Sequence, residues 1–474
     1  MKNVYVFKLV LIISFLYINS SLFLFFLNWI STPYSFLISF VFLGYSVSQF
    51  LSINLVHYPV FNRNHLYWIG FISLVLTVVS GISGLGGLPQ FDINHHLHKI
   101  VDIGKLTWPI YYFDPRSFAS YYFGFYTVPG LVYTFFGNVK LVAFCWELLG
   151  VYIGLFWIYL FFNKSILKTA LVFGHSGLLS IIMPLFKNES LFTSKYFSFS
   201  DIPWFLLPNY FTLRWVPNQF IYGVIAIGLF LYFRKTKNLI YISTIVIAGF
   251  FWAPFVSLFF GLIYFVSLIH CLYRGYIAWD KNLVYHLVIN SFLLSIIFLY
   301  LISNQTSQSI IFLIDSKQRI INYCLVLFLE VLVFYSLIQK KYKLRIELLV
   351  ALVSLITLPL FKLGNGNDLF ARGSFPMIFI VFLYFIKSIK FNTTLVNIKR
   401  IVLLLLISIL PAKYLIHSVL NFSFKLDFKE SRDVYIAIKR DYQSKKVADQ
   451  YLMNSNSFFY KYLLKKDSIN CSDN

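Results

Sequence analysis

A short polar stretch, Phe91–Arg116, concentrates residue types that could do chemistry in an otherwise apolar chain. It contains Asp92, His95, His96, His98, Lys99, Asp102, Lys105, Asp114 and Arg116. In a helix over 92–106, Asp92, His96 and Lys99 would share one face. A carboxylate flanked by imidazoles can take a proton from a hydroxyl group or bind a divalent cation. The stretch therefore predicts a catalytic or metal site.

The same residues also have structural interpretations. Asp92 could cap the helix that starts at Ile93, because Asp is a preferred N-cap residue. His95, His98 and Asp102 would share a second helix face and could ligate a metal, although clustered surface histidines often bind none. We expect no particular cofactor, and a divalent metal stays open.

A second polar segment, Gly364–Pro376, contains Asn367, Asp368 and Arg372. Backbone N–H groups of a glycine-rich turn beside Arg372 would suit a phosphate. The alternative is a tight turn with Asp368 paired to Arg372 four residues later. Two further segments of interest are Leu213–Gln219, which contains Arg214, and Trp252–Phe255, where we place an outer hairpin.

The composition indicates that helices in a membrane must position these segments. Hydrophobic residues form 59% of the 474 residues and charged residues 12%, with a mean hydropathy of +0.74, which is too apolar for a soluble domain. Thirteen apolar windows of spanning length lie at 5–28, 34–55, 67–83, 138–162, 169–186, 219–233, 239–255, 257–272, 283–303, 320–339, 346–362, 374–389 and 401–417. We expect an all-α integral membrane protein.

The net charge of +22 does not indicate a nucleic-acid partner, because Lys and Arg lie mainly in short loops, where they orient helices. All of the basic loops lie on the same side of the membrane only if the stretch 239–272 crosses it twice, with a turn at Pro254. A single long helix over 239–272 is the alternative. We then expect a cytoplasmic N-terminus and an outer C-terminus. The cysteines Cys145, Cys271, Cys324 and Cys471 form no metal or disulfide pattern.

This orientation places all four segments on the outer side. The large outer loops are 84–137 and 187–218. We expect residues 1–417 to form the polytopic domain and 418–474 a small extracytoplasmic appendage. Within the spans, Glu147 and Glu330 are acids of a kind that often marks an ion path, which keeps a transporter or flippase as an alternative.

The ordered series Asp92–His96, Leu106–Pro109, Phe123–Gly130, Trp215–Gln219, Trp252–Phe255 and Asn367–Pro376 resembles uncharacterised bacterial membrane proteins similar to the GT-C glycosyltransferases. The blocks extend over roughly residues 90 to 380. Those enzymes use a polyprenyl-phosphate-linked sugar and carry a catalytic Asp or Glu in the first large outer loop. The acid usually follows the first span directly, whereas three predicted spans precede Asp92.

The resemblance implies sugar transfer from a polyprenyl-phosphate carrier to a glycan or lipid acceptor, on the outer face of a bacterial inner membrane. Asp92 would be the general base, and His95, His96 or Lys99 would orient the substrate. Arg372, together with Arg214 or Arg116, would bind the lipid-linked phosphate, beside Asn367 and Asp368. The alternatives are a surface-polysaccharide polymerase or ligase, a transporter or flippase, and a non-catalytic membrane scaffold.

Overall fold

The protein is an all-α membrane protein with very little sheet. The computed structural model describes residues 2–53, 59–81, 83–85, 92–179, 181–182, 209–305, 310–314, 316–363, 367–423, 428 and 431–466. Its short strands form two sheets of two strands each, β1 (Tyr111–Tyr112) with β2 (Ser117–Phe118) and β3 (Ile311–Phe312) with β4 (Phe361–Lys362). Both pairs of strands are antiparallel, with Tyr111 opposite Phe118 and Ile311 opposite Lys362.

Eight helical stretches among the described residues are long and apolar enough to cross a membrane. Five of them are single helices: α1 (Lys2–Trp29), α2 (Tyr34–Leu51), α6 (Val139–Phe161), α12 (Pro254–Tyr273) and α13 (Lys281–Leu301). The others are α14 (Lys317–Leu327) continued by a π-turn, η3 (Phe328–Leu332), and α15 (Val333–Leu337); α18 (Asp368–Gly373) with α19 (Phe375–Ser388); and α20 (Leu395–Leu420).

The remaining five predicted spans correspond to shorter, broken or less apolar helices, so the count of thirteen stays a prediction. They are α3 (Arg63–Ser80), α10 (Pro217–Lys235), η2 (Leu239–Ile242) with α11 (Ser243–Trp252), α17 (Ile346–Thr357) with η4 (Leu358–Leu360), and α7 (Ile166–Ala170) with η1 (Leu171–Gly174). The short helix α16 (Lys340–Lys343) lies in the basic loop before α17. The end of the 169–186 window lies partly outside the described residues.

The stretch 239–272 is two helices and not one. Backbone dihedrals of φ −158° and ψ 80° at Ala253 end α11, and Pro254 begins α12, where its missing N–H costs no helical hydrogen bond. The two helices pack against each other. A Cβ added to Gly261 would lie 3.7 Å from Val246 Cγ1, so positions equally far from the turn face one another, as a hairpin requires.

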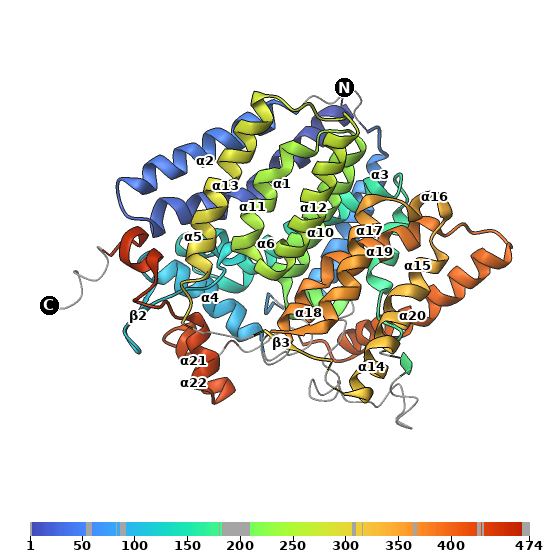
Figure 1. Cartoon of the computed structure of the whole chain (residues 1–474). Helices are drawn as coiled ribbons and strands as arrows, with labels where there is room; N and C mark the ends of the chain where they lie inside the picture. Colours follow the sequence, from blue (N-terminus) through green and yellow to red (C-terminus); the bar gives the residue numbers. More distant parts are fainter. Residues whose placement is uncertain are drawn as a thin grey trace.

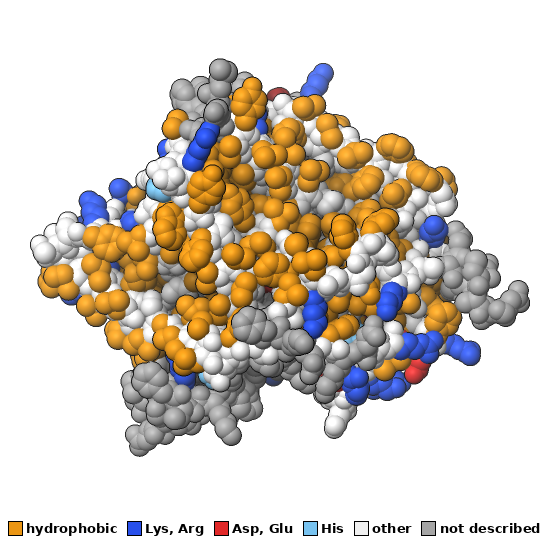
Figure 2. All heavy atoms as spheres, turned by 180° about the vertical axis from the view of Figure 1, so that it is seen from behind, with side chains coloured by type: hydrophobic (Ala, Val, Ile, Leu, Met, Phe, Trp, Pro, Cys, Tyr) orange, Lys and Arg blue, Asp and Glu red, His pale blue; other side chains and the backbone are white. Residues whose placement is uncertain are grey.

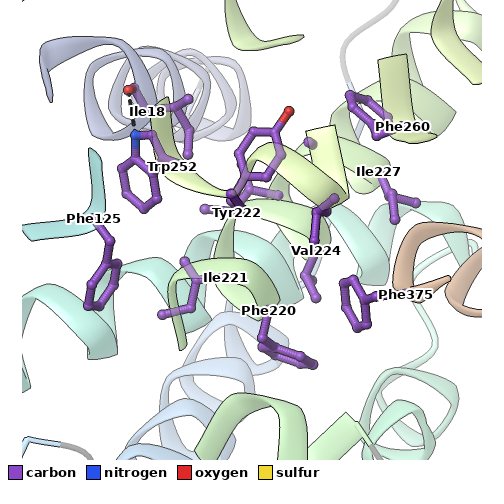
Figure 3. Packing of buried hydrophobic residues seen from close by; sticks show 14 of the residues in the cluster. Ile18, Phe125, Phe220, Ile221, Tyr222, Val224, Ile227, Trp252, Phe260 and Phe375 are labelled. Carbon is purple, nitrogen blue, oxygen red and sulfur yellow. Dashed lines mark hydrogen bonds between the residues drawn. The ribbon is translucent and has the colours of Figure 1, made fainter. Parts of the chain in front are cut away.

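Helix α10 forms the centre of the bundle, and every residue from Pro217 to Leu231 is buried. Figure 3 shows its side chains Phe220, Ile221, Tyr222, Val224 and Ile227 among rings from α5 (Gly124–Phe136), α11, α12 and α19. Trp252 joins this core to α1 by donating a hydrogen bond to the carbonyl of Ile18, 3.1 Å away. A Cβ on Gly154 of α6 would lie 2.9 Å from Val224, so close contact between α6 and α10 depends on glycine.

Apolar side chains also cover much of the outer surface. Figure 2 shows them over most of one face, with Lys and Arg mainly toward its edges. Large apolar residues of α2 and α13 are among the exposed ones, for example Phe40 at 69% and Phe298 at 59%. A surface of this kind is stable against acyl chains and not against water.

The elements that carry the predicted site residues gather at one end of the bundle, which we call the site end. Figure 1 shows α4 (Ile93–Lys105), α18 and α21 (Val434–Tyr442) at this lower end, away from the N-terminus. The other short elements are α9 (Asn209–Trp215), α22 (Lys445–Ala448), η5 (Asp449–Tyr451) and the π-turn η6 (Phe459–Leu463).

The sequence predicts that residues 418–474 form a small appendage. In the structure, the C-terminal segment 431–466 packs into the site end. Helix α21 lies against α4. The N–H of Met453 donates to the carbonyl of Phe118, and the N–H of Lys465 donates to that of Trp29, at 2.8 and 3.0 Å. The segment is therefore tied by backbone hydrogen bonds both to β2 and to the end of α1.

Candidate functional site

The four segments that the sequence predicts on the outer side meet at the site end. Trp215 Nε1 donates a hydrogen bond to Asp92 Oδ2, and Asn218 Nδ2 donates to the carbonyl of Trp252, 3.0 Å away. Arg372 Nη1 donates to the hydroxyl of Tyr122 at 2.8 Å. Because Tyr122 belongs to the same loop as Asp92, these bonds connect segments far apart in the chain into one cluster.

Asp92 lies at the start of α4, but its side chain makes no capping hydrogen bond to that helix, so the capping interpretation is wrong. The carboxylate points across the site instead. Oδ1 accepts a hydrogen bond from the hydroxyl of Tyr442 at 3.0 Å and lies 3.4 Å from Nδ1 of His95. Oδ2 accepts from the Trp215 indole. The side chain keeps 17% of its surface exposed.

These neighbours keep Asp92 ionised. Burial acts to raise its pKa, but the hydrogen bonds with His95 and Tyr442 outweigh burial and lower the pKa to about 2. A carboxylate that accepts several donors is stabilised in its charged form. Asp92 is therefore a fixed negative charge at neutral pH.

His96 holds the site together and does not offer a free nitrogen. Its Nε2 lies 3.0 Å from the carbonyl of Trp215 and must donate, so Nδ1 accepts from the hydroxyl of Tyr126 at 2.7 Å. Burial lowers the pKa of His96 to about 3. The imidazole is thus neutral, and it orients the residue whose indole contacts Asp92.

His95 lies between two carboxylates. Its Nε2 is 3.0 Å from Asp441 Oδ2, and its Nδ1 faces Asp92. The ring also stacks on Tyr442, with centroids 5.4 Å apart. His95 therefore links the first turn of α4 to the end of α21.

The second face of α4 binds the C-terminal segment, which leaves it little capacity for a metal. His98 donates from Nδ1 to the carbonyl of Asn94 and accepts at Nε2 from the N–H of Ser431. Asp102 Oδ2 accepts from the N–H of Val434 at 2.9 Å and from Tyr112 at 3.2 Å. Among the described residues no group of three or more His, Cys, Asp or Glu could hold a metal ion.

Lys99 is 3% exposed and sits in a cage of tyrosines. Its Nζ lies 4.5 Å from the ring centroid of Tyr121, 5.1 Å from that of Tyr126 and 5.2 Å from that of Tyr451. Burial lowers the pKa of Lys99 to about 7; the charge of Asp92 raises it and that of Arg372 lowers it further. The carboxylate and both cations thus share one electrostatic environment.

Arg372 faces the same cage from α18. Its Nε lies 3.0 Å from Asp368 Oδ1, as the spacing of four residues predicts, and both side chains are nearly one-third exposed. The Tyr122 ring, whose hydroxyl Arg372 contacts, stacks on Tyr121 with centroids 3.9 Å apart. Asn367 is buried in a left-handed conformation before α18, with φ 51°. The glycine-rich turn 364–366 lies outside the described residues.

The other two predicted arginines have different surroundings. Arg214 is buried in α9, directly before Trp215. Arg116 is exposed at the turn between β1 and β2, with a left-handed φ of 61°. The structure therefore brings Arg372 and Lys99 together, and it puts Arg116 on the surface.

The two intramembrane acids lie outside this cluster. Glu147 Oε1 accepts a hydrogen bond from Ser80 at 3.0 Å. Glu330, in the π-turn η3, accepts at Oε1 from the N–H of Leu179 at 2.7 Å. Each carboxyl group thus has a local partner on a neighbouring segment.

The residues that sequence reasoning missed come mostly from the C-terminal segment. Asp441, Tyr442 and Tyr451 contact His95, Asp92 and Lys99, respectively. The amphipathic pattern of 431–440 indicates a helix but not where that helix docks. Comparison with family models, curated proteins and solved structures gives no match for this chain.

Proposed function

We propose that this protein is a membrane glycosyltransferase that moves a sugar from a polyprenyl-phosphate carrier to an acceptor hydroxyl at the site end of its bundle. The observation that carries the proposal is the meeting of an ionised carboxylate, Asp92, with two cations, Lys99 and Arg372, in a tyrosine-lined cluster where transmembrane helices end. Transfer from a lipid-linked phosphate needs a negative group that takes the proton of the acceptor and a positive group that stabilises the leaving phosphate, both at the membrane surface.

Asp92 acts on the acceptor. Its oxygen Oδ1 is held by Tyr442, which belongs to the C-terminal segment and not to the transmembrane bundle. The acceptor hydroxyl donates to the second lone pair of Oδ2, beside the bond from the Trp215 indole. The bond from Tyr442 keeps the carboxylate in the position from which it takes the proton of the acceptor.

The cations act on the donor. The acceptor oxygen attacks the anomeric carbon as its proton passes to Asp92, and the bond from that carbon to the phosphate oxygen breaks. The lipid phosphate leaves with an added negative charge. Arg372, which already donates to Tyr122, and Lys99 stabilise that charge in a poorly hydrated site. His95 and His96 position Asp92 and do not contact substrate.

The setting follows from the expected orientation. The site end faces the outer side of a bacterial inner membrane, where the acceptor is a glycan or a lipid of the cell envelope. The apolar flank of the bundle, seen in Figure 2, lets a polyprenyl chain stay in the bilayer while its phosphate reaches the site.

The test is transfer from polyprenyl-phosphate-linked hexoses and pentoses in membrane vesicles that contain the full chain. Asp92→Asn should abolish transfer while the protein keeps its membrane insertion and its unfolding temperature. The matched control is Asp102→Asn on the same helix: burial raises the pKa of Asp102 to about 8, so Asn resembles its protonated form and transfer should persist.

Three results would reject the proposal. One is full transfer by Asp92→Asn. Another is equal loss in both variants, which would show a structural role for α4. The third is an absence of transfer from every polyprenyl-phosphate sugar tested. Product size distinguishes addition of one sugar from chain extension, so the same assay reports a polymerase.

A further inference from the structure

Three helices that begin at the site end finish close together at the opposite end of the bundle. Helix α10 starts two residues after Trp215, α19 starts three residues after Arg372, and α6 starts beside α4. With 23 residues in α6 and 19 in α10, their lengths are about 34 and 28 Å at 1.5 Å per residue. The two ends are therefore a membrane thickness apart.

Five cations from different elements gather where these helices end, and we call them the basic cluster. They are Lys168 of α7, Lys235 of α10, Lys341 of α16, Arg345 before α17 and Lys387 of α19. Lys168 Nζ donates to the carbonyl of Lys387 at 3.3 Å. Lys341 Nζ and Lys387 Nζ lie 4.9 and 5.9 Å from the ring centroid of Tyr342, and the N–H of Arg345 donates to the carbonyl of that residue at 3.0 Å. Lys235 is the fourth cation whose charge acts on Lys387. Lys235, Lys341 and Arg345 are exposed.

The partial negative charges of the helix C-termini offset only part of the positive charge of the basic cluster. Lys387 Nζ donates to the carbonyl of Phe161 at 2.9 Å, and Lys168 Nζ donates to that of Ile389 at 2.7 Å. Three helix C-termini carry roughly −0.5 charge each, and the N-terminus of α17 carries about +0.5. An excess of about four positive charges therefore remains.

The nearby carboxylate does not offset that excess. Glu347, in the first turn of α17, is fully buried and pairs with Arg234 through Oε2, while Oε1 accepts a hydrogen bond from Tyr384. Its charge is therefore already compensated by a cation outside the basic cluster.

Apolar and aromatic side chains surround the cations. Lys387 Nζ lies 3.7 Å above the ring centroid of Phe161, and Lys341 Nζ lies 4.9 Å from that of Tyr342. Leu344 is 83% exposed and Leu167 is 54% exposed. Cations beside rings and exposed leucines, at the end of transmembrane helices, match the boundary between lipid headgroups and acyl chains.

We propose that the basic cluster binds the phosphate headgroup of an anionic phospholipid, in the leaflet opposite the candidate active site. The cations contact the phosphate, and Leu344 and Leu167 contact the acyl chains. A soluble phosphate would contact only the cations and not the leucines. This site goes beyond the proposed function, because it needs no sugar transfer.

The experiment measures thermal unfolding of the purified full chain in detergent during titration with phosphatidylglycerol. Phosphatidylcholine with the same acyl chains and inorganic phosphate are parallel arms. A ligand that binds the native state raises the unfolding temperature. We expect phosphatidylglycerol to raise it and the other two to have little effect.

The test variant is Lys235→Gln with Lys341→Gln, both at exposed positions. Each cation near an anionic headgroup contributes on the order of 1 kcal/mol, so the double change should weaken phosphatidylglycerol binding about 30-fold. The matched control, Lys445→Gln with Lys446→Gln, removes two exposed lysines from the site end and should bind as the wild type does. Arg345→Gln provides a second, independent test of the cluster.

Three outcomes would overturn the proposal. Equal stabilisation by phosphatidylcholine would show that charge is irrelevant. Equal stabilisation by inorganic phosphate would identify a small-anion site. Equal weakening in the two double variants would show a general effect of net charge. None of these outcomes depends on whether Asp92→Asn loses transfer.

Discussion

Replacing Lys99 by Met should stabilise the protein while abolishing its proposed activity. Lys99 is buried among Tyr121, Tyr126 and Tyr451, and burial lowers its pKa from 10.5 to about 7. At about 1.4 kcal/mol per pH unit, folding opposes the charged form by about 5 kcal/mol. Met has a similar shape and carries no charge to bury, so we expect a gain of about 2–4 kcal/mol at pH 7.

The sign of the pH dependence follows from proton binding. The folded pKa of Lys99 lies below its unfolded value, so between pH 7 and 10.5 the unfolded state binds more protons than the folded state. Stability of the wild type therefore rises with pH in that window, and the penalty is complete below it. The advantage of Lys99→Met should be largest at pH 7 or below and vanish toward pH 10.

Thermal unfolding in detergent from pH 6 to pH 10 measures this difference. Lys105→Met is the matched control, because Lys105 is an exposed residue of the same helix; its unfolding temperature should follow that of the wild type. A less stable Lys99→Met protein at pH 7 would refute the reasoning, because it would mean that the tyrosine cage favours the cation more than burial disfavours it.

Three further changes test the geometry of the site. Tyr442→Phe removes one of the donors to Asp92, and since a hydrogen bond to a charged group contributes about 1.5–3 kcal/mol, kcat/KM should fall at least tenfold at unchanged expression. Arg372→Lys keeps the charge but not the planar fork, and should lower kcat by at least tenfold with the fold intact by circular dichroism. Gly124→Ala would place a Cβ 2.5 Å from Trp252 Cδ1 and 2.8 Å from a backbone oxygen, so it should destabilise the protein by about 1–3 kcal/mol, measured as a lower unfolding temperature.

Local patterns predicted the helices of the site with good accuracy. The predicted helix 92–106 is α4 at 93–105, and its two faces separate as the spacing indicates: His96 and Lys99 face α5, while His98 and Asp102 face the C-terminal segment. Pro254 marked the hairpin turn, because proline fits the first position of a helix and disfavours its interior.

Other features of the site depend on tertiary contacts that no local pattern encodes. Asp92 stands where an N-cap is expected, yet Trp215 and Tyr442 offer its carboxylate better donors than the helix does. Both donors are more than 100 residues away in the chain. Similarly, hydropathy places a span at 219–233 but does not indicate that α10 is enclosed by other helices.

That enclosure bears on how the protein is made. Acyl chains do not touch α10 in the folded state, and α10 is not among the stretches apolar enough to cross a membrane alone. The insertion of α10 into the bilayer should therefore depend on contact with another helix. Helix α6 is synthesised before α10 and packs against it most extensively. Changes at the contact between α6 and α10, such as a larger residue at Gly154, would then act during insertion, before any finished molecule exists to be destabilised.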